Sequence, residues 1–199
     1  MIILSFIFWG VGTVDKSTGA PIAEVGKEKI SVEEYWTAYD RAREYYRNIT
    51  KGNFTEEMEK KLNLKQKILD TLVDERLLLI EAKKTGLAVS DSELREAIVN
   101  DPAFVRDGKF NEDVYVRTLQ LNRLTPEYFE SLKKKELTLS KMRRLIGGSI
   151  EITDQAISDP ALAAYVQPML SQMRDKAVKS YVEGLKKQTK IKINEQLLG

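Results

Sequence analysis

The sequence predicts a mainly α-helical protein whose multi-helix core carries a small β-sheet. Apolar residues recur at three- and four-residue spacing through most of residues 31–188, which is the pattern of amphipathic helices. Only residues 22–31 and 190–194 alternate with period two, as strands do. An isolated strand or hairpin is unstable in water, so we expect these two segments to pair. The two ends of the core would then meet in one sheet.

The first residues raise a question of location. Residues 1–14, MIILSFIFWGVGTV, are apolar apart from a Ser and a Thr. No Lys or Arg precedes them, so the positively charged start of a signal peptide is absent. Fourteen helical residues span about 21 Å, which is short of a hydrocarbon core of roughly 30 Å. Trp9 followed by glycines is typical of the outer end of a membrane span. We expect part of a longer membrane anchor here, the alternative being a buried core helix.

The remaining chain is expected to form one core domain. Residues 15–21 form a polar linker, residues 22–150 the N-terminal part of the domain, and residues 151–199 a helix and strand that complete it. The segment IAEVGKEKIS, residues 22–31, predicts a β-hairpin that turns at Gly26 and Lys27.

Capping signals predict where the helices begin. A Ser, Thr or Asn before a helix accepts a free backbone N–H, and a Glu three residues later can reach back to form a capping box. Five such starts are Ser31 (with Glu34), Thr55, Ser90 (with Glu93), Asn111 and Thr125. The first helix should end near Gly52, and a long helical segment should run from Thr55 to Gly86.

The last fifty residues are expected to contain one long helix between two extended segments. SIEITD, residues 149–154, reads as extended, and residues 160–188 as a helix with a break or kink near Pro168. Residues 190–194 form the predicted edge strand.

The segment DPAFVRDGKF, residues 101–110, could be a cation loop, a catalytic loop or a rigid corner. The spacing of its acids and its glycine does not fit an EF-hand. Pro102 stops the preceding helix and Asp107-Gly108 is a tight-turn dipeptide. Phe104 and Phe110 flank that turn as apolar pegs. We therefore predict a structural corner made by Pro102, Phe104, Gly108 and Phe110.

The composition argues against most enzyme classes. The chain has no His and no Cys, so serine or cysteine catalytic triads and ordinary zinc sites are excluded. Gly10-Val11-Gly12 lacks the third glycine of a dinucleotide loop. We predict no catalytic, cofactor-binding or metal-binding residues, and no cofactor.

The charge balance argues against nucleic-acid binding, because 32 basic side chains face 30 acidic ones. Six basic residues do cluster on the predicted helix that begins after Thr125, with two acids interleaved. We interpret them as a solvated helix face. They are Lys133, Lys134, Lys135, Lys141, Arg143 and Arg144.

Aromatic and Met side chains are the candidate binding residues. Five aromatic residues crowd the helix that follows Ser31, and two of these are adjacent, so they cannot all face the core. Exposed aromatic and Met side chains suit adaptable binding of apolar peptides, although such a stripe is more often core. The candidates are Tyr35, Trp36, Tyr39, Tyr45, Tyr46, Met142, Met169 and Met173.

The order of these segments resembles that of SurA/PpiD-type periplasmic chaperones. An apolar anchor, the hairpin IAEVGKEKIS, and ILDTLVDERLLLIEAKKTGLAVSDSELREAI are similar to their N-terminal domain. DPAFVRDGKFNEDVYVRTLQLNRLTPEYFESLKKKEL is the most specific part of the resemblance, and YVEGLKKQTKIKINEQLL looks like the tail that completes that domain. A parvulin isomerase domain normally separates the two halves. Here ITDQAISDPALAAY connects them directly.

The resemblance implies an ATP-independent holdase for unfolded exported or outer-membrane proteins, without isomerase activity. It also implies a location in the periplasm, tethered to the inner membrane. One alternative is an envelope assembly or scaffold factor that docks one folded partner, and another is an isomerase that has lost its usual residues. The C-terminal helix could also complete a neighbour's core, which would give a swapped homodimer.

Overall fold

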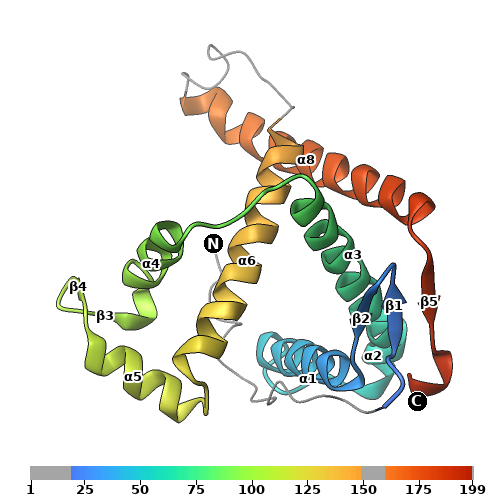
Figure 1. Cartoon of the computed structure of the whole chain (residues 1–199), viewed down its shortest axis with the longest axis horizontal. Coiled ribbons are helices and arrows are strands. Elements are labelled where there is room, and N and C mark those ends of the chain that lie inside the picture. Colours follow the sequence, from blue (N-terminus) through green and yellow to red (C-terminus); the bar gives the residue numbers. More distant parts are fainter. Residues whose placement is uncertain (1–18, 149–159, 199) are drawn as a thin grey trace.

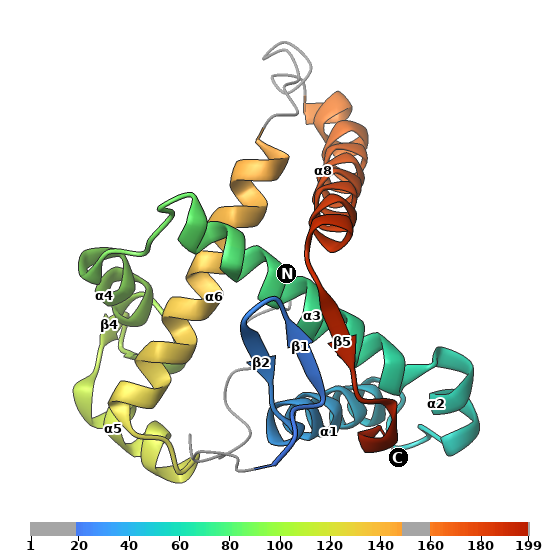
Figure 2. The same ribbon diagram turned by 45° about the vertical axis from the view of Figure 1, so that its right-hand side comes forward.

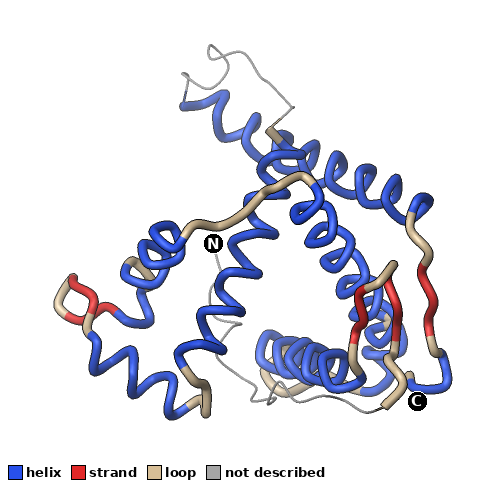
Figure 3. The backbone as a smooth tube through the Cα atoms, in the orientation of Figure 1, coloured by secondary structure: helices blue, strands red, loops and turns tan. Residues whose placement is uncertain are grey.

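The computed structural model describes residues 19–148 and 160–198, with side chains for all of these except 160–165. The predicted anchor (1–14) and the predicted extended segment (149–154) lie outside the described residues. Within them the fold is mainly helical with a small sheet, as predicted (Figure 1, Figure 3).

The predicted pairing of the chain ends is confirmed. β1 (Ala23–Val25) lies at the centre of an antiparallel three-stranded sheet, between β2 (Glu28–Ile30) and β5 (Ile191–Ile193). Ala23 stands opposite Ile30 on one side and Ile193 on the other. The backbone N–H of Gly26 also bonds the carbonyl of Lys190, so the hairpin turn itself is tied to the tail. The sheet packs against α3.

Seven helices and two short 3₁₀ turns make up the rest of the described chain. In order they are α1 (Val32–Ile49), α2 (Glu56–Leu62), α3 (Leu64–Lys84), α4 (Asp91–Val99), η1 (Pro102–Phe104), α5 (Glu112–Leu121), α6 (Pro126–Gly147), α8 (Pro160–Gln188) and η2 (Glu195–Leu197). The short hairpin of β3 (Val105–Arg106) and β4 (Lys109–Phe110) lies between η1 and α5.

All five predicted helix starts are confirmed by a side-chain hydrogen bond at the cap. Each cap oxygen accepts the backbone N–H of the residue three positions on. The box at Ser90 is complete, because the Glu93 carboxylate accepts the Ser90 N–H at 2.8 Å. At Ser31 only the first half forms, since the Glu34 carboxylate instead accepts hydrogen bonds from two basic side chains described below.

One prediction about helix continuity is wrong, and a second is wrong in part. The expected helix from Thr55 to Gly86 is broken at Asn63, which has φ +48° and separates α2 from α3. Asn tolerates this left-handed conformation better than most residues, so the break costs little. Conversely, the break expected near Pro168 is absent, because α8 continues as a helix through this residue, while the alternative of a kink there stays a prediction.

The described residues form two hydrophobic cores, the body core and the arm core, and we call the elements around each core the body and the arm. The body core joins the sheet, α1, α3, α8 and the second half of α6, and it buries large side chains such as Tyr35, Leu69 and Leu77. The arm core joins α4, η1, α5 and the first half of α6 around Phe104, Tyr115 and Phe129. Figure 1 shows α4 and α5 on one side of α6, and α3, α1 and the sheet on the other.

α6 is tied to its neighbours by ion pairs, which corrects our interpretation of its basic cluster as a solvated face. Lys133 is buried, and its ammonium lies 3.2 Å from the Asp101 carboxylate of the arm. Four further cations of the cluster also meet acids on other helices, while Arg144 is exposed. These pairs are Lys134–Asp91, Lys135–Glu34, Lys141–Glu93 and Arg143–Glu75.

Candidate functional site: a cleft between α1, α3 and α6

A cleft of about 810 Å³ lies between α1, α3 and the first half of α6. α3 and α6 pack together near the C-terminal end of α3 and diverge toward the end where α1 lies, in both views (Figure 1, Figure 2). Its volume falls within the range of roughly 300–1,000 Å³ that is usual for ligand pockets. Apolar side chains from all three helices line it: Ala38, Ala42, Tyr45, Ile68, Leu72, Leu79, Tyr128 and Leu132.

α1 presents two apolar faces: one is buried in the body core, and the other lines the cleft, with Ala38 at the boundary because it also packs against that core. Tyr35 and Tyr39 face inward and are buried. Ala38, Ala42 and Tyr45, spaced three to four residues apart, face the cleft. This second face extends the apolar surface along α1, because side chains four residues apart lie on one side of a helix.

An ion cluster centred on Glu34 lies among the residues that line the cleft. Its carboxylate accepts a hydrogen bond from Arg76 of α3 at 2.6 Å and another from Lys135 of α6 at 3.2 Å. Arg76 also lies 3.9 Å from the Glu28 carboxylate of β2. Glu34 therefore joins the three helices that form the cleft. The cations draw it away from its capping role, because a charged hydrogen bond is stronger than one to a neutral N–H.

Arg41 adds a cation inside the apolar part of the cleft. Its side chain is half-buried among the lining residues. Burial lowers the pKa of the Arg41 guanidinium, and the nearby Tyr128 partly opposes this. The guanidinium stays charged, and its planar face and N–H groups can contact an aromatic ring or a carbonyl of a bound chain.

The eight candidate binding residues fall into three groups in the structure. Tyr35, Tyr39 and Met142 are buried in the body core, and Trp36 packs against it beneath the Lys65 ammonium. Their side chains offer little surface to a ligand in this conformation. The Tyr39 hydroxyl donates a hydrogen bond to the Glu59 carboxylate. Burial, and to a smaller extent this hydrogen bond, raises the pKa of Tyr39 to about 12.

The adjacent residues Tyr45 and Tyr46 do not both face the core: their rings contact each other edge to face, with centroids 5.6 Å apart, and neither is buried. Tyr45 is 37% exposed and lines the cleft. Tyr46 stacks on Phe54, with ring centroids 5.1 Å apart. Of the five aromatic candidates on α1, Tyr45 is thus the one that borders the cleft.

The two remaining candidates, Met169 and Met173, lie outside the cleft. They are one helical turn apart on α8 and are 51% and 43% exposed. Leu145, near the end of α6, is also exposed. We call these three side chains the α6–α8 surface.

Sequence reasoning missed most of the residues that line the cleft. Those from α3 and α6 belong to ordinary amphipathic stripes, and nothing in one sequence shows that these two helices diverge. A signal was present on α1, where Ala38 and Ala42 continue a second stripe beside Tyr45.

The corner at residues 101–110 is built as part of the arm. Phe104 is fully buried and packs edge-on against Tyr115 and Phe129. Pro102 opens η1, while Phe110 is half-buried against the same cluster. Asp107 and Gly108 have φ of +53° and +77°, a pair of positive values that matches a type I′ turn. None of the corner's residues is among those that line the cleft.

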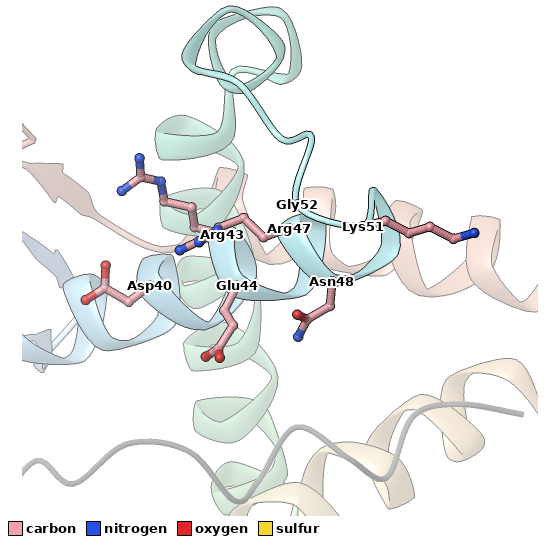
Figure 4. Close-up of a pocket in the computed structure, with 7 residues that line it drawn as sticks. All are labelled: Asp40, Arg43, Glu44, Arg47, Asn48, Lys51 and Gly52. Carbon is pink, nitrogen blue, oxygen red and sulfur yellow. The ribbon is translucent and has the colours of Figure 1, made fainter.

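A second, smaller hollow lies on the outer side of α1 and carries mainly polar and charged side chains. Its volume is about 480 Å³. Figure 4 shows the guanidinium groups of Arg43 and Arg47 close together, with Lys51 pointing away from them. Arg43 pairs with Glu59 at 3.5 Å. This hollow offers no apolar surface comparable with that of the cleft.

Across the described ranges, 19–148 and 160–198, no three acidic side chains are grouped as they would be around a metal ion. In the same ranges, no helix combines the length and the apolar character needed to cross a membrane.

The family model of the SurA-like N-terminal domain matches residues 1–143. The chain belongs to this family. It is 27% identical over 190 residues to the periplasmic chaperone PpiD of Haemophilus ducreyi, and this match covers 91% of the present chain. It is also 29% identical over 165 residues to PpiD of Haemophilus influenzae, and 29% identical over 150 residues to the foldase protein PrsA of Caldanaerobacter subterraneus.

These relatives are longer proteins. The match covers 29% of the first PpiD, 26% of the second and 48% of PrsA. The predicted resemblance to SurA/PpiD-type chaperones is confirmed, and it concerns the SurA-like domain of these proteins.

Proposed function

We propose that this SurA-like domain is an ATP-independent holdase that binds unfolded exported or outer-membrane polypeptides in the cleft between α1, α3 and α6. The observation that carries the proposal is an apolar cleft open to solvent in a member of this family. Relatives named as periplasmic chaperones and a foldase support it. No reaction and no cofactor are needed.

The chemistry of the cleft favours weak and broad binding. Its walls are mainly aliphatic and aromatic, with the hydroxyls of Ser31, Thr37, Thr71 and Ser131 between them. Six charged side chains also line it: Glu33, Glu34, Arg41, Glu75, Arg76 and Lys135. Apolar side chains of a client can enter such a surface without a fixed hydrogen-bond pattern. Ordering a flexible client costs conformational entropy, which diffuse apolar contact offsets only in part.

The proposed location is the periplasm, with the chain tethered to the inner membrane through residues 1–14. The names of the PpiD relatives support a periplasmic location. The apolar composition of residues 1–14 supports the tether.

The test is suppression of aggregation. The full 199-residue chain is mixed at several-fold excess with a denatured outer-membrane protein, and light scattering is followed. We expect suppression by the wild type and its loss in Tyr45→Ser. Tyr181→Ser is a matched control, because Tyr181 is also 37% exposed but lies on α8. Absence of suppression by the wild type would remove the proposal, and equal loss in both variants would remove the cleft as its site.

A second candidate function is docking of one folded partner in envelope assembly, and the α6–α8 surface favours it. Three exposed apolar side chains, Leu145, Met169 and Met173, are available there outside the cleft. In pulldown experiments, this function predicts one partner that binds saturably to the wild type and is not retained by the double variant Met169→Ser/Met173→Ser. That result, together with no effect of the protein on the aggregation of generic clients, would support this function over the holdase. A proline-isomerisation assay is expected to match buffer.

A further inference from the structure

The two cores of the protein meet through one helix. Phe129 and Leu137 of α6 pack in the arm core, whereas Leu139 and Met142 pack in the body core. The main helix contacts of α4 and α5 are with α6 and η1, while α1 packs on α3. The arm is therefore joined to the body mainly through α6, which changes from one core to the other at residues 137–139.

The cleft lies across this junction. Its α6 wall consists of Tyr128, Ser131, Leu132 and Lys135, all from the half of α6 that belongs to the arm. Its other walls, from α1 and α3, belong to the body. A change in the angle between arm and body would therefore change the width of the cleft.

The middle of α6 carries a feature that bends helices. The Thr138 hydroxyl donates a hydrogen bond to the carbonyl of Lys134, four residues earlier, at 2.8 Å. Such back-bonding competes with the helical hydrogen bond to that carbonyl and often bends a helix slightly. Thr138 lies between Leu137 of the arm core and Leu139 of the body core.

Two ion pairs bracket this position. Before it, Lys135 reaches from the arm half of α6 to Glu34 of the body at 3.2 Å. After it, Lys141 reaches from the body half of α6 to Glu93 of the arm at 2.8 Å. Arg76 holds the Glu34 carboxylate in place from α3. Both pairs are partly exposed, so dissolved salt can screen them.

We propose that the arm moves relative to the body about a hinge at Thr138, and that the Lys135–Glu34 ion pair sets the width of the cleft. Breaking this ion pair lets the arm move away from α1. The hinge is a property of the chain alone. Its role in admitting a client rests on the proposed holdase function.

The absence of Cys from the chain makes the hinge directly measurable. Cys residues introduced at the exposed positions Glu44 on α1 and Gln120 on α5 carry spin labels, and the distance distribution between them is recorded for the full chain. We expect one main distance in the wild type at low salt. In Lys135→Met, the population at longer distances should rise about two- to fivefold, as expected for losing one partly exposed pair.

Lys134→Met is the matched control, because Lys134 pairs with Asp91 within the arm. It should leave the distance distribution unchanged. Raising the salt from about 0.1 M to 1 M shortens the screening length from roughly 10 Å to 3 Å, so the wild type should shift toward Lys135→Met. Thr138→Val removes the hydroxyl that bonds the Lys134 carbonyl, so it should narrow the distribution of distances between the two spin labels.

The proposal is overturned if Lys135→Met and high salt both leave the wild-type distances unchanged, or if Lys134→Met shifts them equally. The salt series needs no substitution beyond the two exposed label sites, so a misfolded ion-pair variant cannot leave the question open. Suppression of aggregation without any change in distance would remove the hinge and keep the holdase. A changing distance without suppression would keep the hinge and remove the holdase.

Discussion

Replacing Lys133 by Met should destabilise the arm strongly. The side chains of Lys133 and Asp101 are only 4% and 5% exposed, and their charged groups lie 3.2 Å apart. Asp101 uses its second carboxylate oxygen to accept the backbone N–H of Ala103 at 3.1 Å, which caps η1. Met has nearly the length of Lys but no charge, so the variant leaves the Asp101 carboxylate buried without its cation.

Removing one partner of a buried pair costs about 3–5 kcal/mol, because the remaining charge stays desolvated. For a chain of this size, each kcal/mol lowers the melting temperature by about 2–4 °C, so the expected decrease is roughly 6–20 °C. Asp101→Asn should cost less, since Lys133 retains Glu136 at 3.4 Å. The double variant should cost clearly less than the sum of the two single ones.

The assay is urea unfolding together with native-state hydrogen exchange. Because the arm has its own core, amides of α4 and α5 should lose protection before those of α3. Lys134→Met is again the control, since that exposed pair contributes at most about 1 kcal/mol. A Lys133→Met protein within 1 kcal/mol of the wild type, or one in which body and arm lose protection together, would refute this reasoning.

Three further predictions concern single side chains. The pKa of Glu93 is lowered from 4.5 to about 2, mainly by the hydrogen bond that its carboxylate accepts from Lys141. The contribution of the Glu93 carboxylate to stability is therefore present above pH 4.5 and is lost as the pH falls toward 2. The difference in melting temperature between the wild type and Glu93→Gln should therefore shrink as the pH falls from 5 to 2, and a constant difference would contradict this. The pKa of Tyr39 is raised from 10.0 to about 12. The amount by which the wild type is more stable than Tyr39→Phe should therefore be full below pH 10 and vanish as the pH rises toward 12. Ultraviolet absorbance should show one phenol that titrates late. Gly108 has φ +77°, so Gly108→Val should cost about 1–2 kcal/mol in urea unfolding. The matched control is Gly184→Val, which should cost no stability, because Gly184 is helical and a Cβ added there meets no atom within 4 Å.

Local signals in the sequence predicted most of the secondary structure. A cap such as Ser90 with Glu93, and a turn such as Gly26, depend on residues within four positions of each other. The break at Asn63 was missed because the polar and apolar residues on its two sides suit a helix equally well. The local signal was Asn63 itself, because Asn tolerates the left-handed conformation that ends a helix.

The candidate site was harder to predict, because its geometry depends on contacts far apart in the chain. Lys133 was interpreted as solvated, yet its partner Asp101 lies 32 residues earlier. Glu34 was assigned to a cap, while its actual partners are 42 and 101 residues later. Aromatic residues drew attention to α1, but which of its two faces is open depends on where α6 lies. The sequence-based expectation that these aromatics contact clients remains a prediction for Tyr45 and is hard to reconcile with the burial of Tyr35 and Tyr39.

The position of β5 has a consequence for the order in which the chain folds. Lys192 bonds Glu24 across 168 residues, and β1 stays without its second neighbour until the last residues of the domain are available. The arm, by contrast, is built from contacts within about fifty residues and can form as soon as it has been synthesised. During vectorial synthesis or export, the arm should therefore be complete while the body still waits for its final strand, because closing a long loop slows folding.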